Sequence, residues 1–152
     1  MLSINTWGNY VWIFFHTFAN IIGEQKFIKH KSNILELIRI VCNNLPCPEC
    51  ANDATKYLAY FNLEQNINSK SDLKKFFHYF HNVINIKLKK PQFDINKLDE
   101  QYSNLEFDSI YKNFMKVFTI KINGPSNMMM MHSFKRHRSV DKIQSILLSI
   151  MN

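Results

Sequence analysis

The chain has 152 residues, 46% of them hydrophobic and 14% aromatic, with a formal net charge of +7. That length predicts one domain that can bury a core without disulfide staples. Only three glycines and four prolines argue against a loop-rich sandwich or a disordered chain. No apolar run approaches the roughly 20 residues of a membrane-spanning helix, and the first residues show no secretory leader. Basic residues are spread along the chain, so no nucleic-acid partner is expected.

The first 90 residues predict a helical bundle. Apolar side chains recur at steps of three and four residues in four segments, which is the period of a helix with one buried face. The second segment is expected to be capped by Ser32 and the fourth to open at Ser71 and Asp72. Gly23, the turn at 43–46 and Lys90-Pro91 separate or end these helices. The segments are residues 7–22, 32–41, 48–61 and 71–88.

After Pro91 the helical signal is weaker. A short fifth helix over 95–102 completes the predicted bundle, residues 1–103. The remainder, 104–152, is predicted to be a helical extension that covers the bundle or offers a partner surface. Its expected elements are helices over 105–118 and 140–151 and a loop over 123–127.

Two unusual runs lie before the last predicted helix. Met128–Met131 predicts a mobile loop or an apolar contact, with a soft-metal site as the alternative. Lys135–Arg138 predicts solvated basic residues in a loop, with phosphate contacts as the alternative.

The sharpest chemical feature is Cys47-Pro48-Glu49-Cys50 at the start of the third predicted helix. Two cysteines at this spacing can close a disulfide within one turn. The unpaired N–H groups and the positive end of the helix dipole favour a thiolate, so one sulfur is expected to have a lowered pKa. No strand precedes the motif, which argues against a thioredoxin fold. The alternatives are a structural pair or, with His78 and His81, a zinc site.

A second pattern places Gly8, Trp12 and His16 on one stripe of the first helix, after Trp7. A glycine, a flat ring and an imidazole in line could hold a flat aromatic cofactor. A plain core helix would give the same spacing.

A third pattern lies on the fourth helix, where His78, Asn82, Asn85 and Lys89 share one face. Asparagine is a poor helix former, so two at this spacing suggest a hydrogen-bonding role. The alternative is a solvated polar face.

Together the three patterns resemble the FAD-linked sulfhydryl oxidases of the Erv/ALR family, in the compact form found in large DNA viruses. That family has W-G-x-x-x-W-x-x-x-H, then C-x-x-C, then H-N-x-V-N-x-x-L-x-K-P. The last motif stands here as residues 81–91, with Ile84 in place of valine. The resemblance covers about residues 6–103.

The resemblance implies an all-α four-helix bundle with a short fifth helix, FAD at its mouth and a homodimer. Cys50 would lie against the flavin ring, and Cys47 would be attacked by incoming thiols. Tyr102 would stack in place of a tryptophan that many members have. The implied cofactor-binding residues are Trp7, Gly8, Trp12, His16, His81, Asn82, Asn85, Lys87, Lys90 and Tyr102.

The implied activity is FAD-dependent thiol oxidation. Electrons would pass from the Cys47–Cys50 pair to FAD and then to O₂, giving H₂O₂ and a disulfide in a thiol-containing protein substrate or a thioredoxin-like carrier. Cys42 is expected to be a buried apolar residue, with a resolving role as the alternative. The expected location is the host cytoplasm or virion of a large DNA virus, or the intermembrane space of a protist mitochondrion. The competing hypotheses are the zinc-stapled binding module and a helical nucleic-acid or virion-surface protein.

Overall fold

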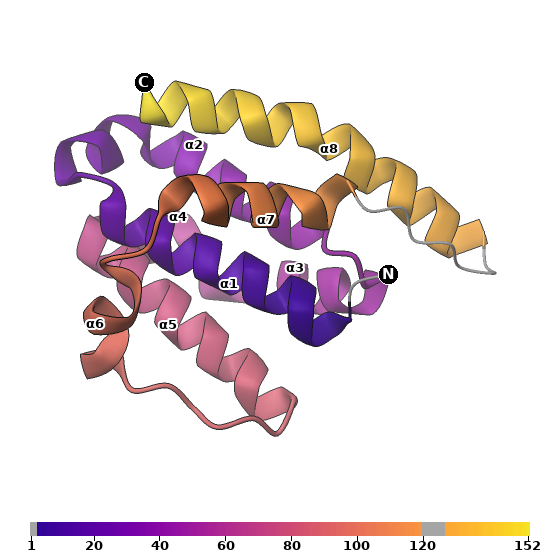
Figure 1. Cartoon of the computed structure of the whole chain (residues 1–152), viewed down its shortest axis with the longest axis horizontal. Helices are drawn as coiled ribbons and strands as arrows, with labels where there is room; N and C mark the ends of the chain where they lie inside the picture. Colours follow the sequence, from indigo (N-terminus) through magenta and orange to yellow (C-terminus); the bar gives the residue numbers. More distant parts are fainter. Residues whose placement is uncertain (1–2, 120–126) are drawn as a thin grey trace.

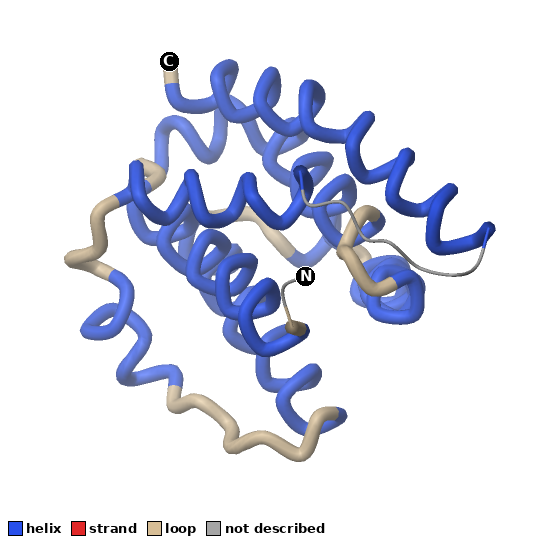
Figure 2. The backbone as a smooth tube through the Cα atoms, turned by 45° about the vertical axis from the view of Figure 1, so that its right-hand side comes forward, coloured by secondary structure: helices blue, strands red, loops and turns tan. Residues whose placement is uncertain are grey.

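The computed structural model describes residues 3–119 and 127–152. Figure 2 shows helices joined by loops, with no strand in these two ranges. The all-α prediction, with a bundle and a helical extension, is therefore confirmed. The elements are α1 (Ile4–Ile21), α2 (Glu24–Asn43), α3 (Pro48–Phe61), α4 (Leu63–Asn66), α5 (Lys70–Lys87), η1 (Ile95–Lys97), α6 (Leu98–Tyr102), α7 (Phe107–Thr119) and α8 (Asn127–Met151).

The start of α2 differs from the prediction. It begins at Glu24 after Gly23, and Ser32 lies inside the helix instead of capping it. The backbone leaves helical geometry only at His30, with φ −112° and ψ 17°. The segment before this kink is helical because Phe27 is completely buried in the core, so tertiary packing outweighs the local cap signal.

Two other helix starts follow local chemistry. α3 begins at Pro48 as predicted, since proline suits the first helical turn. α5 begins at Lys70, slightly before the predicted Ser71. The cap is Ser69, whose Oγ accepts a hydrogen bond of 3.0 Å from the backbone N–H of Asp72.

The extension is more helical than predicted. Both Met128–Met131 and Lys135–Arg138 lie in α8, so the loop prediction for these runs is wrong. The predicted loop at 123–127 falls outside the described residues, except for Asn127, where α8 begins. The buried stripe of α8 continues ahead of the predicted start at Val140, which explains the longer helix. Its buried residues are Arg136, Ser139, Ile143, Ile146, Leu147 and Ile150.

Aromatic packing on two faces of α1 organises the core. Toward α5, Phe15 stacks on Phe77 with ring centroids 4.5 Å apart. Toward α7, Phe14 stacks on Phe114 with ring centroids 3.8 Å apart. Figure 1 shows α7 lying along α1, with α8 beyond it and packed on α2. The bundle and the extension thus share one continuous apolar core.

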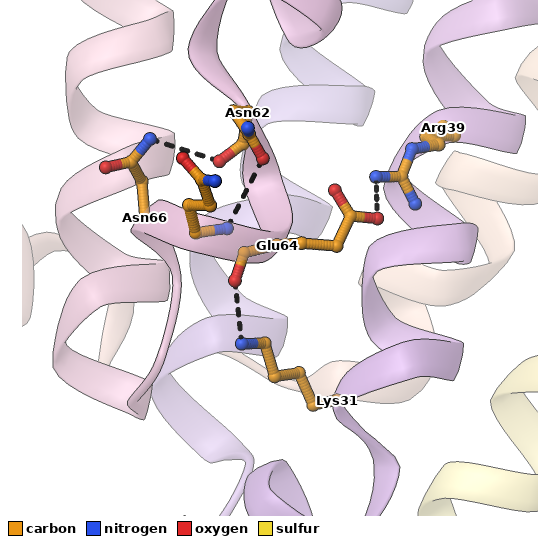
Figure 3. Close-up of polar contacts among 6 residues, drawn as sticks. Lys31, Arg39, Asn62, Glu64 and Asn66 are labelled. Atoms are coloured by element: carbon orange, nitrogen blue, oxygen red, sulfur yellow. Dashed lines mark hydrogen bonds and ion pairs between the residues drawn. The ribbon is translucent and has the colours of Figure 1, made fainter.

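A polar corner holds the end of α3 against α2 (Figure 3). The turn into α4 passes through Asn62, whose φ of 57° is left-handed, a conformation that asparagine tolerates better than most residues. Next to it, Glu64 pairs with Arg39, and the Glu64 carbonyl accepts a 3.0 Å hydrogen bond from Lys31 Nζ. These contacts join α4, which directly follows α3, to α2.

None of the helices formed by residues 3–119 and 127–152 has the length and apolar character needed to cross a bilayer.

We predict that Phe114→Ala destabilises the protein by about 3–5 kcal/mol, because it empties a fully buried site against Phe14. Urea denaturation followed by circular dichroism would measure the free energy of unfolding. Phe134→Ala is the matched control, since Phe134 is 60% exposed, and its effect should stay within about 0.5 kcal/mol. Equal losses in the two variants would show that α7 is not part of the core.

Candidate active site

The cysteine pair lies at the N-terminus of α3, where Cys47 and Cys50 form a disulfide with Cα atoms 5.1 Å apart. Cys47 is the N-cap residue, and its Sγ accepts a 3.2 Å hydrogen bond from the backbone N–H of Cys50. Both residues are only half-buried. The positive end of the α3 dipole favours a thiolate here once the disulfide is reduced. The pair is therefore placed for thiol–disulfide exchange.

A pocket of about 370 Å³ opens beside the disulfide, between α1, α3 and α5. That volume falls in the range of small-molecule and cofactor sites. Nine of the twelve residues that the sequence nominated line it: Trp7, Gly8, Trp12, Cys47, Cys50, His81, Asn85, Lys87 and Lys90. Its apolar wall also includes residues that sequence reasoning assigned only to the core, namely Val11, Phe15, Phe80, Ile84 and Leu88.

The lining of the pocket suits a flat ring system. Gly8 lies in its wall, and a Cβ added there would meet no heavy atom within 4 Å, so the missing side chain leaves open space. Part of the wall is aromatic, because Trp12 and His81 both line the pocket and stack on each other with ring centroids 4.2 Å apart and planes 9° apart. The disulfide forms a third part of the wall.

Behind this wall, His16 and His81 form a buried hydrogen-bonded pair. His16 Nε2 and His81 Nδ1 are 3.0 Å apart, so one nitrogen donates and the other accepts. Burial, with the charges of His81 and His78, lowers the pKa of His16 to about 3. Burial, with the charges of His78 and Lys90, lowers the pKa of His81 to about 4. Both imidazoles are therefore neutral at pH 7.

Three of the nominated residues lie outside the pocket lining. His16 and Tyr102 stack on each other, with ring centroids 4.6 Å apart, and His16 is hydrogen-bonded to His81. Burial raises the pKa of Tyr102. One buried atom of this group, His16 Nδ1, has no hydrogen-bond partner.

Asn82 is the third nominated residue outside the lining, and it holds the chain that follows α5. Its Oδ1 accepts a 2.8 Å bond from the N–H of Phe93, and its Nδ2 donates a 3.0 Å bond to the carbonyl of Phe93. This explains the asparagine in the helix as a structural clamp. Its predicted contact with a cofactor stays a prediction.

Two lysines supply positive charge at the pocket. Lys87 pairs with Asp53 on α3, and Lys90 Nζ donates a 2.8 Å hydrogen bond to Asn5 Oδ1 on α1. Sequence reasoning missed both partners. The signal for Asp53 was present, because Glu49 and Asp53 are four residues apart on one face of the helix that starts at the cysteine pair.

This arrangement argues against the alternative zinc site, which would use Cys47, Cys50, His78 and His81. The sulfurs of Cys47 and Cys50 are joined to each other, and His78 bonds to the carbonyl of Phe93 at 2.6 Å. Within the described ranges, no three His, Cys, Asp or Glu residues gather as potential metal ligands.

The third cysteine also lines the pocket but is not part of the disulfide. Cys42 is buried, as predicted. Burial raises the pKa of its thiol far above the ordinary value, so the sulfur stays protonated and unreactive at neutral pH.

Comparison with known proteins gives several relatives of 29–30% identity. Protein 096R of Invertebrate iridescent virus 3, whose name includes the words FAD-linked sulfhydryl oxidase, is 29% identical over 63% of this chain and 65% of its own length. The FAD-linked sulfhydryl oxidase ERV1 of Arabidopsis thaliana is 30% identical over 65% of this chain and 51% of its own. The mitochondrial FAD-linked sulfhydryl oxidase ERV1 of Saccharomyces cerevisiae is 29% identical over 64% and 50%. The chain thus spans between half and two thirds of each relative.

The fold has a solved counterpart. The crystal structure of the yeast Erv1 core superposes with a TM-score of 0.62, at 24% identity, over 70% of this chain and 89% of that one. The family model described as Erv1 / Alr matches residues 9–103, which contain nearly all of the pocket and most of the bundle. Since that match covers more than half of the chain, the protein belongs to the Erv1 / Alr family.

Proposed function

We propose that the chain is an FAD-dependent thiol oxidase that forms disulfides in protein substrates. One observation carries the proposal: a half-buried disulfide at a helix N-terminus forms part of the wall of a pocket suited to a flat ring. The names of the relatives support FAD as the ligand. The reaction is 2 R–SH + O₂ giving R–S–S–R + H₂O₂.

The residues present fit FAD. Trp12, His81 and the space beside Gly8 suit the flat ring, and Lys87 and Lys90 can meet the phosphates. When bound, FAD supplies the two-electron acceptor that regenerates the disulfide and reduces O₂. The protein supplies the slot, the cations and the position of the disulfide.

The exchange step uses the protein's own sulfurs. A substrate thiolate attacks Cys47 Sγ, the Cys47–Cys50 bond breaks, and Cys50 leaves as a thiolate. A second substrate thiolate then attacks the substrate sulfur of the mixed disulfide. The substrate leaves oxidised by two electrons, and Cys47 and Cys50 remain as the reduced pair. We assign attack to Cys47 because it is the cap residue outside the helix, whereas Cys50 lies within the first turn.

The same proposal includes the setting. The substrate is a cysteine-bearing protein or a thioredoxin-like carrier, with O₂ as the final acceptor. The viral relative favours the host cytoplasm or virion of a large DNA virus, and the mitochondrial yeast relative keeps the intermembrane space as the alternative. The homodimer stays a prediction.

The first test is spectroscopic and enzymatic. The purified protein, or protein mixed with FAD, should show bound flavin absorbance, and it should consume O₂ when dithiothreitol is added. Cys47→Ser and Cys50→Ser should each lower turnover by at least about a hundredfold, since neither leaves a disulfide to exchange. Cys42→Ala is the matched control and should keep turnover, because its thiol is buried and protonated. A protein that never binds flavin would overturn the proposal.

The buried histidines predict loss of stability in acid. The pKa values of His16 and His81 in the folded chain, about 3 and 4, lie below the ordinary 6.5. Below pH 6.5 the unfolded chain therefore binds protons that the folded chain does not. Each histidine then lowers the free energy of unfolding by up to about 1.4 kcal/mol per pH unit as the pH falls.

Urea unfolding between about pH 7 and pH 5 would measure this slope. In His81→Asn, which removes one of the two shifted groups, the slope should be shallower. Flavin binding by the folded protein should stay constant over the same range, because both rings remain neutral above their lowered pKa values and keep the His16–His81 hydrogen bond. A slope equal in the two proteins would contradict the assignment.

A further inference from the structure

The helix α8 is attached to the loop that leads into the disulfide. His132 Nε2 donates a 2.5 Å hydrogen bond to the carbonyl of Leu45, and Lys135 Nζ donates a 3.2 Å bond to the carbonyl of Asn43. Only Pro46 separates Leu45 from Cys47, so their Cα atoms are at most about 7 Å apart. The extension therefore lies beside the redox pair, although it is outside the region that the family model matches.

The order of these contacts sets the direction of α8. The later residue, Lys135, bonds to Asn43, and the earlier one, His132, bonds to Leu45. Moving toward the N-terminus of α8 thus means moving along the loop toward Cys47. Figure 1 shows this part of α8 extending past the end of α7, free of other helices on its outer side. The methionine run is consequently on the disulfide side.

The outer face of this part of α8 is apolar and exposed. Met130, Met131 and Phe134 are 55%, 70% and 60% exposed. They are neighbours on the helix surface at spacings of three and four residues. A cluster of exposed apolar side chains marks an interaction surface more often than isolated ones do, and methionine adapts to partners of different shape. We call Met130, Met131 and Phe134 the outer apolar face.

Positive charge borders the outer apolar face. Lys135 and Arg138 are both exposed and lie next to it. Asp141 is the only acidic residue from 127 to 152 in the sequence, and the whole chain carries +7. A partner with acidic residues would therefore be favoured here over a basic one.

We propose that the outer apolar face, with its basic border, is the docking surface for the cysteine-bearing segment of the substrate protein. That segment would be apolar and acidic around its cysteine. The inference rests on the proposed thiol oxidation, since a thiol that attacks Cys47 must reach bonding distance of its sulfur. The residues that flank that thiol extend over the surface around Cys47, to which α8 is joined through His132. Met130 and Phe134 lie on the other side of the helix from His132, so the segment would continue around α8 to reach them.

The direct test is binding, and it does not depend on turnover. The probe is a fluorescein-labelled peptide with leucine and glutamate around a serine that replaces the cysteine, and fluorescence anisotropy gives Kd. We expect Met131→Glu/Phe134→Glu to raise Kd at least about tenfold. The matched control is Ile28→Glu/Leu148→Glu, because these side chains are 61% and 62% exposed. They lie near the other ends of α2 and α8, 15 residues before Asn43 and 13 residues after Lys135. It should bind like wild type.

Charge and catalysis give two further readouts. A peptide with lysine in place of glutamate should bind wild type at least about tenfold more weakly, and Arg138→Glu should narrow that difference. The acidic peptide with its cysteine restored is a substrate, so its kcat/KM can be divided by the kcat/KM of dithiothreitol for each protein. This ratio should fall about tenfold in Met131→Glu/Phe134→Glu and stay constant in the control.

The outcomes separate the two proposals. Equal Kd values for wild type, Met131→Glu/Phe134→Glu and the control would overturn the docking surface, even if all three oxidise dithiothreitol. Equal binding of the acidic and basic peptides would overturn the charge preference. If wild type oxidises no dithiothreitol, and only Met131→Glu/Phe134→Glu loses peptide binding, the result would support the docking surface and overturn the oxidase proposal.

Discussion

The structure depends on the burial of α1 from two sides. Consecutive residues Phe14 and Phe15 stack on α7 and α5 respectively, so neither face of α1 is available to solvent. This constraint fixes the distance between α1 and α5, which are two walls of the pocket. It also makes the extension part of the core. Close aromatic packing makes these walls rigid, as the proposed binding of a planar group requires.

Burial in the same apolar core also determines which polar side chains of the site are charged. His16 and His81 are neutral because burial disfavours their charged forms. A neutral pair can share one hydrogen bond, and it adds no positive charge next to the aromatic wall. The cations are instead at Lys87 and Lys90, each held by a partner on another helix. The neutral ring of His81 and the charged side chains of Lys87 and Lys90 thus line one pocket.

Much of this arrangement was predictable from the sequence. The helical periods of residues 7–22 and 71–88 gave α1 and α5 nearly as they are, and the cysteine spacing gave the disulfide at the start of α3. Local signals failed where tertiary contacts decide the outcome. Ser32 looks like a cap, but the buried Phe27 makes the preceding turns helical. The polar run at 135–138 looks like a loop, but Arg136 is buried in α8.

The sequence predicted most of the residues that form the site, but it did not predict the contact that each of them makes. The motifs nominated twelve residues, and the structure gathers nine at the pocket. The spacing of residues within one helix could not show that Asn82 binds the backbone of Phe93 or that His16 stacks on Tyr102. In each pair the second residue comes from a later segment of the chain. The position of α8 beside the disulfide depends on two long-range hydrogen bonds. No periodic pattern in one segment encodes such contacts.

The burial of Cys42 has a consequence for the protein itself. In the proposed oxidase the Cys47–Cys50 disulfide accepts electrons from thiols, so a third reactive thiol in the same chain would attack it from within. Such an internal exchange would trap the chain in a wrong pairing and remove it from use. Cys42 lies five residues before Cys47 and lines the same pocket, yet its thiol stays protonated inside the core. Proximity without ionisation protects the protein from oxidising itself.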